Sequence, residues 1–83
     1  MKIKNGRNEY IIKEEHFKES LLSQSFIEDA ILSNFNIVVQ EGSFHESETN
    51  IILPDGKIRL IMEFDWNDDL HSFIARGARM ENF

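Results

Sequence analysis

Alternating hydrophobic and polar residues give the clearest structural signal in the chain, over residues 57–66. Apolar side chains stand at every second position and polar side chains stand between them, with Ile61 as the exception. Successive side chains of a β-strand point to opposite faces, so this period of two predicts a strand with one buried face. An isoleucine among the polar positions indicates that the second face is partly covered. The apolar positions are Ile58, Leu60, Met62, Phe64 and Trp66.

Two further strands are expected before this one. The apolar run 37–39 begins the first, which Gly42 is expected to bend or bulge, and residues 49–53 form the second. Pro54-Asp55-Gly56 then has the composition of a tight turn, in which proline fixes φ and glycine accepts positive φ. Together these segments predict a three-stranded antiparallel meander.

A hairpin is predicted at the N-terminus. Asn5-Gly6 suits a two-residue turn, because both residues tolerate positive φ. Folding about this turn would pair Lys2 with Glu9, which carry opposite charges, and Ile3 with Asn8. It would also gather four apolar side chains on one face, namely Met1, Ile3, Tyr10 and Ile12.

The segment between the hairpin and the meander reads as helix, since residues 13–41 contain no glycine or proline. It carries two apolar stripes at helical spacing, one through Ile27 and Ile31 and the other through Phe26 and Ala30. A single straight helix would place the stripes on nearly opposite sides. A break at residues 23–25 removes the conflict and predicts two short helices, at about 14–22 and 26–34.

Local capping patterns set the expected ends of the helices. Ser25 followed by Glu28 has the spacing of a capping box, and Asn34 or Asn36 is expected to end that helix. A last helix is expected after Asn67, because the following residues, Asp68 and Asp69, would complement its dipole. Leu70, Phe73 and Ile74 would form its buried stripe and Gly77 its end, whereas residues 78–83 show no clear pattern.

The predicted fold is α+β, with element order ββ-αα-βββ-α in a single domain over residues 1–83. An antiparallel sheet, made of the N-terminal hairpin and the three-stranded meander, would carry two to three short helices packed on one face. The order α-βββ-α resembles the double-stranded RNA-binding domain. The expected helix start at Asn67-Asp68-Asp69 would repel phosphates, so direct nucleic-acid binding is not expected.

Composition narrows the class of protein. A chain of 83 residues with 41% hydrophobic and 29% charged residues is expected to form one globular domain. The absence of cysteine excludes a disulfide scaffold, a thiolate zinc site and a cysteine nucleophile, and favours the cytoplasm. No signal-like or membrane-spanning segment is apparent, so no membrane association is expected.

Charge is distributed unevenly along the chain. The net charge is −6, and residues 19–56 contain no lysine or arginine. A surface built from this segment would repel nucleic acid and attract a basic protein, although acidic surfaces also serve solubility alone. Its acidic residues are Glu19, Glu28, Asp29, Glu41, Glu46, Glu48 and Asp55.

No catalytic or metal-binding motif stands out. No two of His16, His45 and His71 have metal-ligand spacing on one element. The run 65–69 opens with the D-x-N-x-D spacing of a calcium loop, but it has Leu70 and Arg76 where that loop needs glycine and glutamate. We therefore expect a protein that is not an enzyme and that needs no metal or cofactor.

The chain is expected to be a small acidic protein-binding module. The favoured function is an inhibitor or neutraliser of a basic nuclease or nucleic-acid-binding effector, similar in physical type to bacteriocin-type immunity proteins and phage anti-CRISPR proteins. Phe44 would be an apolar anchor or, alternatively, a core residue. The predicted partner-binding residues are Glu41, Phe44, Glu46, Glu48 and Asp55.

An alternative is a self-associating structural or regulatory domain without catalytic activity. A sheet edge, either the 37–39 strand or the N-terminal hairpin, would pair with a second copy to form a homodimer. Met80 and Phe83 would then pack across the interface.

Overall fold

The computed structural model describes residues 1–18 and 20–82. Strands make up 58% of the described residues, which contain a single α-helix. The predicted α+β class with two to three helices is therefore wrong. The elements are β1 (Lys2–Asn5), β2 (Asn8–Ile11), the 3₁₀ turn η1 (Glu14–His16), α1 (Gln24–Asn34), β3 (Asn36–Glu41), β4 (Phe44–Leu53), β5 (Gly56–Asn67) and β6 (Ser72–Asn82).

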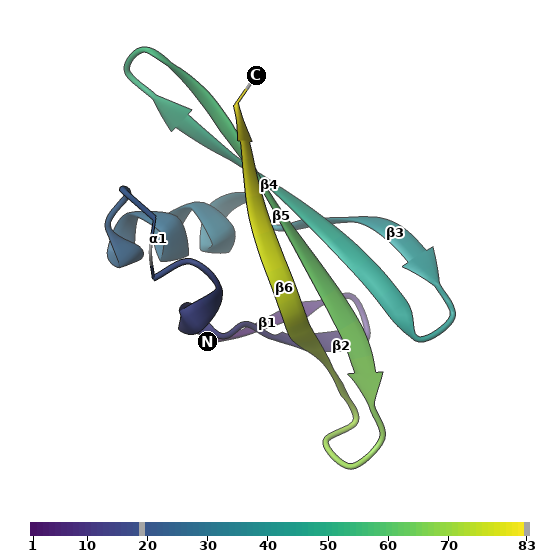
Figure 1. The fold of residues 1–83 in the computed structure, drawn as a ribbon. Coiled ribbons are helices and arrows are strands. Elements are labelled where there is room, and N and C mark those ends of the chain that lie inside the picture. Colours follow the sequence, from purple (N-terminus) through teal and green to yellow (C-terminus); the bar gives the residue numbers. More distant parts are fainter. Residues whose placement is uncertain (19, 83) are drawn as a thin grey trace.

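The strands form one mixed sheet that curves into a half-barrel (Figure 1). Their order is β1-β2-β6-β5-β4-β3, so the N-terminal hairpin lies beside the C-terminal strand. β2 and β6 run parallel, with Tyr10 beside Phe73, whereas the other neighbouring pairs are antiparallel. The prediction of an antiparallel sheet is wrong at this one junction, which no local sequence pattern marks.

The predicted meander is confirmed as β3, β4 and β5, and all three strands are longer than expected. Leu53 pairs with Gly56 across Pro54-Asp55, which gives the expected tight turn, but Gly56 does not have positive φ. Gly42 lies in the turn after β3 with φ 57° and does not form a bulge there. The bulge in β3 is at Val38 instead.

The N-terminal hairpin is confirmed, but its register is not the predicted one. Asn5 pairs with Asn8, so Gly6 and Arg7 form the loop and Ile3 pairs with Tyr10. Gly6 has φ 62° while Arg7 stays at negative φ, which is the placement of glycine that a type II′ turn requires. The shared apolar face survives this shift of two residues because it preserves side-chain alternation.

The helix predicted at about 14–22 is wrong, and the described residues of this range form only the short turn η1. Phe17 is buried in the core, but Leu21, at helical spacing from it, is fully exposed, so the two side chains do not share one buried face. The second predicted helix forms as α1, but it begins at Gln24, inside the residues predicted as a break, and it ends at Asn34 as predicted. Its N-cap is Ser23 and not Ser25, because the Ser23 Oγ accepts a hydrogen bond from the Phe26 amide over 3.3 Å.

The last predicted helix is also wrong. The Asn67 side chain accepts from the Leu70 amide, as an N-cap would, but the chain reverses at His71, whose φ is 49°. Residues 72–82 continue as β6, which also contains most of the tail that showed no pattern. A bulge at Arg76 adds one residue between Ala75 and Gly77 and so hides the alternation of two that would have identified the strand.

The core lies between the sheet and the segment that contains η1 and α1. The face of the sheet toward this segment is the inner face, and the opposite face is the outer face. Ile27 and Ile31 of α1 are fully buried against the inner face, as their helical spacing predicts. The other core residues are Tyr10, Ile12, Phe17, Ile51, Leu60, Met62, Phe64, Phe73 and Ala75.

Candidate functional site

Charged side chains from three strands cover the outer face of the sheet. Alternation along β5 places Arg59, Ile61 and Glu63 there, opposite in direction to the buried Leu60 and Met62. The register aligns Glu48 with Ile61 from one side and Arg79 with Ile61 from the other. Carboxylates and guanidinium groups therefore meet across the strands.

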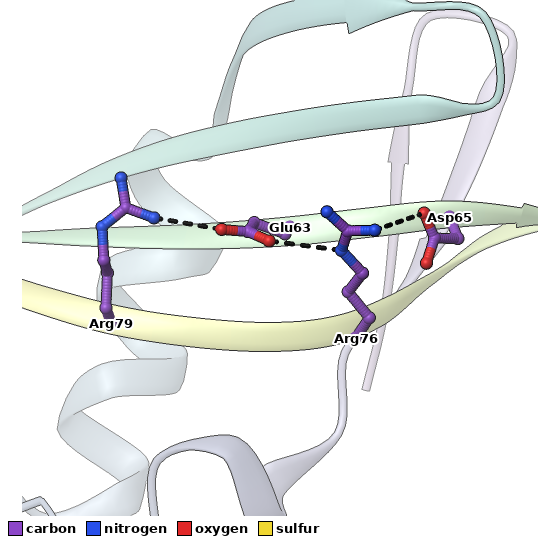
Figure 2. A network of polar contacts seen from close by, with 4 residues as sticks. All are labelled: Glu63, Asp65, Arg76 and Arg79. Atoms are coloured by element: carbon purple, nitrogen blue, oxygen red, sulfur yellow. Dashed lines mark hydrogen bonds and ion pairs between the residues drawn. The ribbon is translucent and has the colours of Figure 1, made fainter.

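These groups form a continuous series of ion pairs, the charge ladder, whose central part is shown in Figure 2. Glu63 accepts from Arg76 over 3.2 Å and from Arg79 over 3.1 Å. Arg76 also reaches Asp65 over 3.3 Å. Beyond Arg79, the series continues through Glu81 (3.5 Å) and Arg59 (4.0 Å) to Glu48 (2.9 Å).

The bulge at Arg76 sets the direction of that side chain. An extra residue in one strand re-aims its side chain and increases the local twist. The guanidinium of Arg76 consequently reaches across β5 and lies 4.6 Å from the ring centroid of Phe44 on β4. One arginine thus connects β4, β5 and β6, with a cation–π contact at its far end.

The ladder also covers an apolar residue. Ile61 lies on the outer face between charged neighbours, yet only 6% of its surface is exposed. Stems of long charged side chains can cover apolar surface while the charged ends remain in water. The prediction that the second face of this strand is partly covered is therefore confirmed, with side chains in place of a helix.

Two carboxylates at one end of the outer face stand outside the ladder. Glu41 pairs in register with Phe44, and Glu46 follows on the same face of β4. Among the described residues, neither glutamate makes an ion pair. Glu46 also lies opposite Glu63, so two like charges face each other across the strands. We call Glu41, Phe44 and Glu46 the acidic corner.

The structure brings together four of the five predicted partner-binding residues. Glu41, Phe44, Glu46 and Glu48 share the outer face at one end of β4, whereas Asp55 lies in the turn at the other end. At the usual rise of a strand, about 3.3 Å per residue, Asp55 is about 30 Å from Glu46. Asp55 therefore does not belong to this site.

The acidic segment 19–56 does not form one face. Glu28 and Asp29 lie on α1, Asp55 lies in the β4–β5 turn, and Glu19 is outside the described residues. Glu48 is neutralised by Arg59. Sequence reasoning missed the arginines of β6 because it assigned that segment to a helix and a tail. The alternation along β5, combined with a two-residue turn at Pro54-Asp55, would have placed Arg59 near Glu48.

A second polar group is enclosed in the core. His45, Ser47 and Thr49 lie side by side along the inner face of β4, and all are buried. The Tyr10 hydroxyl is 2.8 Å from His45 Nδ1, and the His45 ring stacks on Phe73 with centroids 3.9 Å apart. Burial lowers the pKa of His45 and raises the pKa of Tyr10, so both are neutral at pH 7.

The D-x-N-x-D run shows no convergence of ligands. Asp65 pairs with Arg76, and Asp68 accepts from Trp66 Nε1 over 2.7 Å. Within residues 1–18 and 20–82, no group of three or more histidine, aspartate or glutamate side chains could hold a metal ion. The same residues contain no helix with the length and hydrophobicity needed to span a bilayer.

Comparison with protein-family models, with curated proteins and with solved structures finds no match to this chain. Its function must therefore be argued from its own residues. The acidic corner is the site on the outer face whose carboxylates have no ion pair among the described residues.

Proposed function

We propose that this protein is a small binding module that inhibits or neutralises a basic, nucleic-acid-handling protein, and that it has no catalytic role. The observation that carries the proposal is the acidic corner, where unpaired Glu41 and Glu46 flank Phe44 on a face that α1 does not cover. Carboxylates in this position can occupy a phosphate-binding cleft of the partner and accelerate association. A cytoplasmic location belongs to the same proposal, since the chain has no cysteine.

The surroundings of Phe44 favour recognition. Its ring is partly exposed and is held by the Arg76 guanidinium, so little side-chain entropy would be lost on binding. Aromatic and arginine residues are the commonest anchors of protein interfaces. The unpaired glutamates would supply specificity around this anchor, and Glu48 would contribute at its margin.

Charge reversal tests the proposal. Glu41→Lys combined with Glu46→Lys should weaken binding to a basic partner captured from lysate by at least about tenfold, which corresponds to about 1.4 kcal/mol. The matched control is Glu14→Lys with Glu15→Lys, which makes the same charge change on η1. If both double variants lost the same affinity, net charge and not the acidic corner would determine binding. Capture of no basic protein at low salt would contradict the proposal.

Self-association through the β3 edge is the second candidate. β3 is an edge strand of the sheet, and its only charged residue is Glu41. Val38, at its bulge, is 46% exposed. Edges without lysine or proline are prone to pairing. If β3 pairs with a second copy, sedimentation should show a dimer that Val38→Lys dissociates and that the charge reversal at η1 leaves intact.

A further inference from the structure

The far half of β4 has an open edge. β3 pairs with β4 only along Phe44–Glu48, so residues 49–53 have no neighbouring strand on that side within the described chain. The side chain of Asn34, at the end of α1, occupies the first place on this edge. Its Nδ2 donates to the Asn50 carbonyl over 2.9 Å, and its Oδ1 accepts from the Asn50 amide over 2.7 Å.

These two hydrogen bonds identify which backbone groups of β4 point toward its open edge. In an antiparallel strand, backbone direction alternates with each residue, so the groups of Ile52 point the same way as those of Asn50. The next residue whose backbone would point toward the open edge is Pro54, which has no N–H to donate. Asn34 and Pro54 thus close the edge on both sides and leave a gap of one residue at Ile52.

An apolar groove runs beside this gap, between α1 and β4, and has a volume of about 310 Å³. Phe26 and Ala30 of α1 line it on one side and Ile52 on the other. Phe26 is 41% exposed and Ile52 is 62% exposed, so both present apolar surface to solvent. An apolar side chain seated here would bury surface on α1 and β4 together.

The charge around the groove selects the kind of partner. Asp29 lines it, and no lysine or arginine is among its lining residues, since Lys57, which pairs in register with Ile52, lies on the outer face. Asp29 makes no ion pair within the described chain. The groove therefore combines open backbone groups, apolar walls and one carboxylate without an ion pair. A second copy with net charge −6 would bring further negative charge to it.

We propose that this groove binds an extended, lysine- or arginine-bearing segment of a protein partner. One residue of the segment pairs with the backbone of Ile52, an apolar side chain packs against Phe26 and Ala30, and a flanking cation meets Asp29. This mode rests on the proposed function, because it assumes a basic partner, but it uses a surface separate from the acidic corner. Recognition by main-chain pairing also tolerates variation in the partner's sequence.

The test is a titration of the isotope-labelled protein with a synthetic peptide of alternating lysine and valine, followed by amide chemical shifts. The expected result is saturable change at Phe26, Ala30 and Ile52, with at least about tenfold weaker binding in Ile52→Thr. Val38→Thr is the matched control, since it makes a similar change at an exposed β-branched residue of β3. This control should bind as the unmodified protein does.

Other outcomes would overturn the proposal in distinguishable ways. Shifts confined to Glu41, Phe44 and Glu46 would reject the groove and support the acidic corner. Equal binding of a peptide with glutamate in place of lysine would reject selection by charge. A dimer that Ile52→Thr dissociates, seen by sedimentation without peptide, would show that a second copy occupies the groove. Absence of any shift would reject the groove, and capture of a basic protein at the acidic corner would still be judged by its own charge reversal.

Discussion

The inner and outer faces of the sheet are built from the same strands by different chemistry. On β5, Phe64 points inward and is fully buried among aromatic rings, whereas its neighbour Glu63 points outward and meets two arginines. The inner face has α1 above it, while the ladder itself is the covering of the outer face. The comparison separates two roles, since burial supplies most of the stability and exposed charge supplies little. The outer face can therefore vary its charges for recognition with small loss of stability.

Replacing one phenylalanine on each face tests this separation most strongly. Phe64→Ala should lower the free energy of unfolding by about 3–5 kcal/mol, because it leaves a cavity in the core. Phe44→Ala on the outer face should cost only about 1 kcal/mol, because its ring is partly exposed and contacts Arg76. Urea denaturation of both variants measures the difference. Similar losses would mean that the outer face also has a structural core at Phe44.

Two buried hydroxyl groups on the inner face lower the stability that this face supplies. Thr49 Oγ1 and Ser47 Oγ are enclosed and have no hydrogen-bond partner within the described chain. Thr49→Val keeps the shape and removes the unsatisfied hydroxyl, so it should raise the free energy of unfolding by about 1 kcal/mol. Thr49→Ser keeps the hydroxyl and loses the methyl group, so it should lower stability. Both are read from urea midpoints, and destabilisation by valine would show that the hydroxyl has a partner.

Neutralising one carboxylate at a time tests the outer face. Glu63→Gln removes the centre of the ladder and should cost about 0.5–1 kcal/mol at low salt, with a smaller cost in 1 M NaCl. Glu46→Gln removes a carboxylate that has no ion pair and faces Glu63, so it should leave stability unchanged or slightly higher. Thermal melts at two salt concentrations report both changes. A cost for Glu46→Gln equal to that for Glu63→Gln would contradict the division between ladder and acidic corner.

Lowering the pH should reduce the stability of the protein through His45 on the inner face. Burial holds the folded-state pKa of His45 below its ordinary value of 6.5, so below pH 6.5 the unfolded chain binds more protons than the folded chain. Stability from this group is complete above pH 6.5 and is lost as the pH falls through the folded pKa. Tyr10 acts in the opposite direction, because its raised pKa makes stability fall as the pH rises above 10.

Urea midpoints between pH 7.5 and 5 measure the His45 contribution. His45→Gln should flatten the dependence in this range. We expect this to be the smallest effect near neutral pH, where His45 is already neutral. An unchanged pH dependence in His45→Gln would contradict the assignment.

The sequence predicted those parts of the fold in which local chemistry and side-chain alternation agree. The strand at 57–66 and the turn at Pro54 are examples, since their residues specify extension and reversal directly. The capping chemistry at Asn67 was recognised correctly, but a left-handed residue at His71 converted the first turn of a helix into a hairpin. A local cap does not reveal whether a helix follows it.

The candidate site was predicted in part for similar reasons. Glu41, Phe44 and Glu46 come together because β3 and β4 are neighbours in sequence, and a short turn sets their register. Arg76 and Arg79 could not be placed without the bulge in β6, which interrupts the period of two. The parallel pairing of Tyr10 with Phe73 depends on tertiary packing alone, so no pattern in either strand announces it.

That parallel junction has a consequence for how the chain is assembled. β2 is synthesised early, and β6 beside it is synthesised after the other five strands, so the hairpin must wait with Tyr10 and Ile12 exposed to solvent. Contacts between such distant residues form slowly, because a long loop must close first. The hairpins β3–β4, β4–β5 and β5–β6 can form locally during this time. Docking of the N-terminal hairpin then completes the domain. A delay at this last step would expose apolar surface, which makes translation speed and chaperone access the conditions on which the yield of folded protein depends.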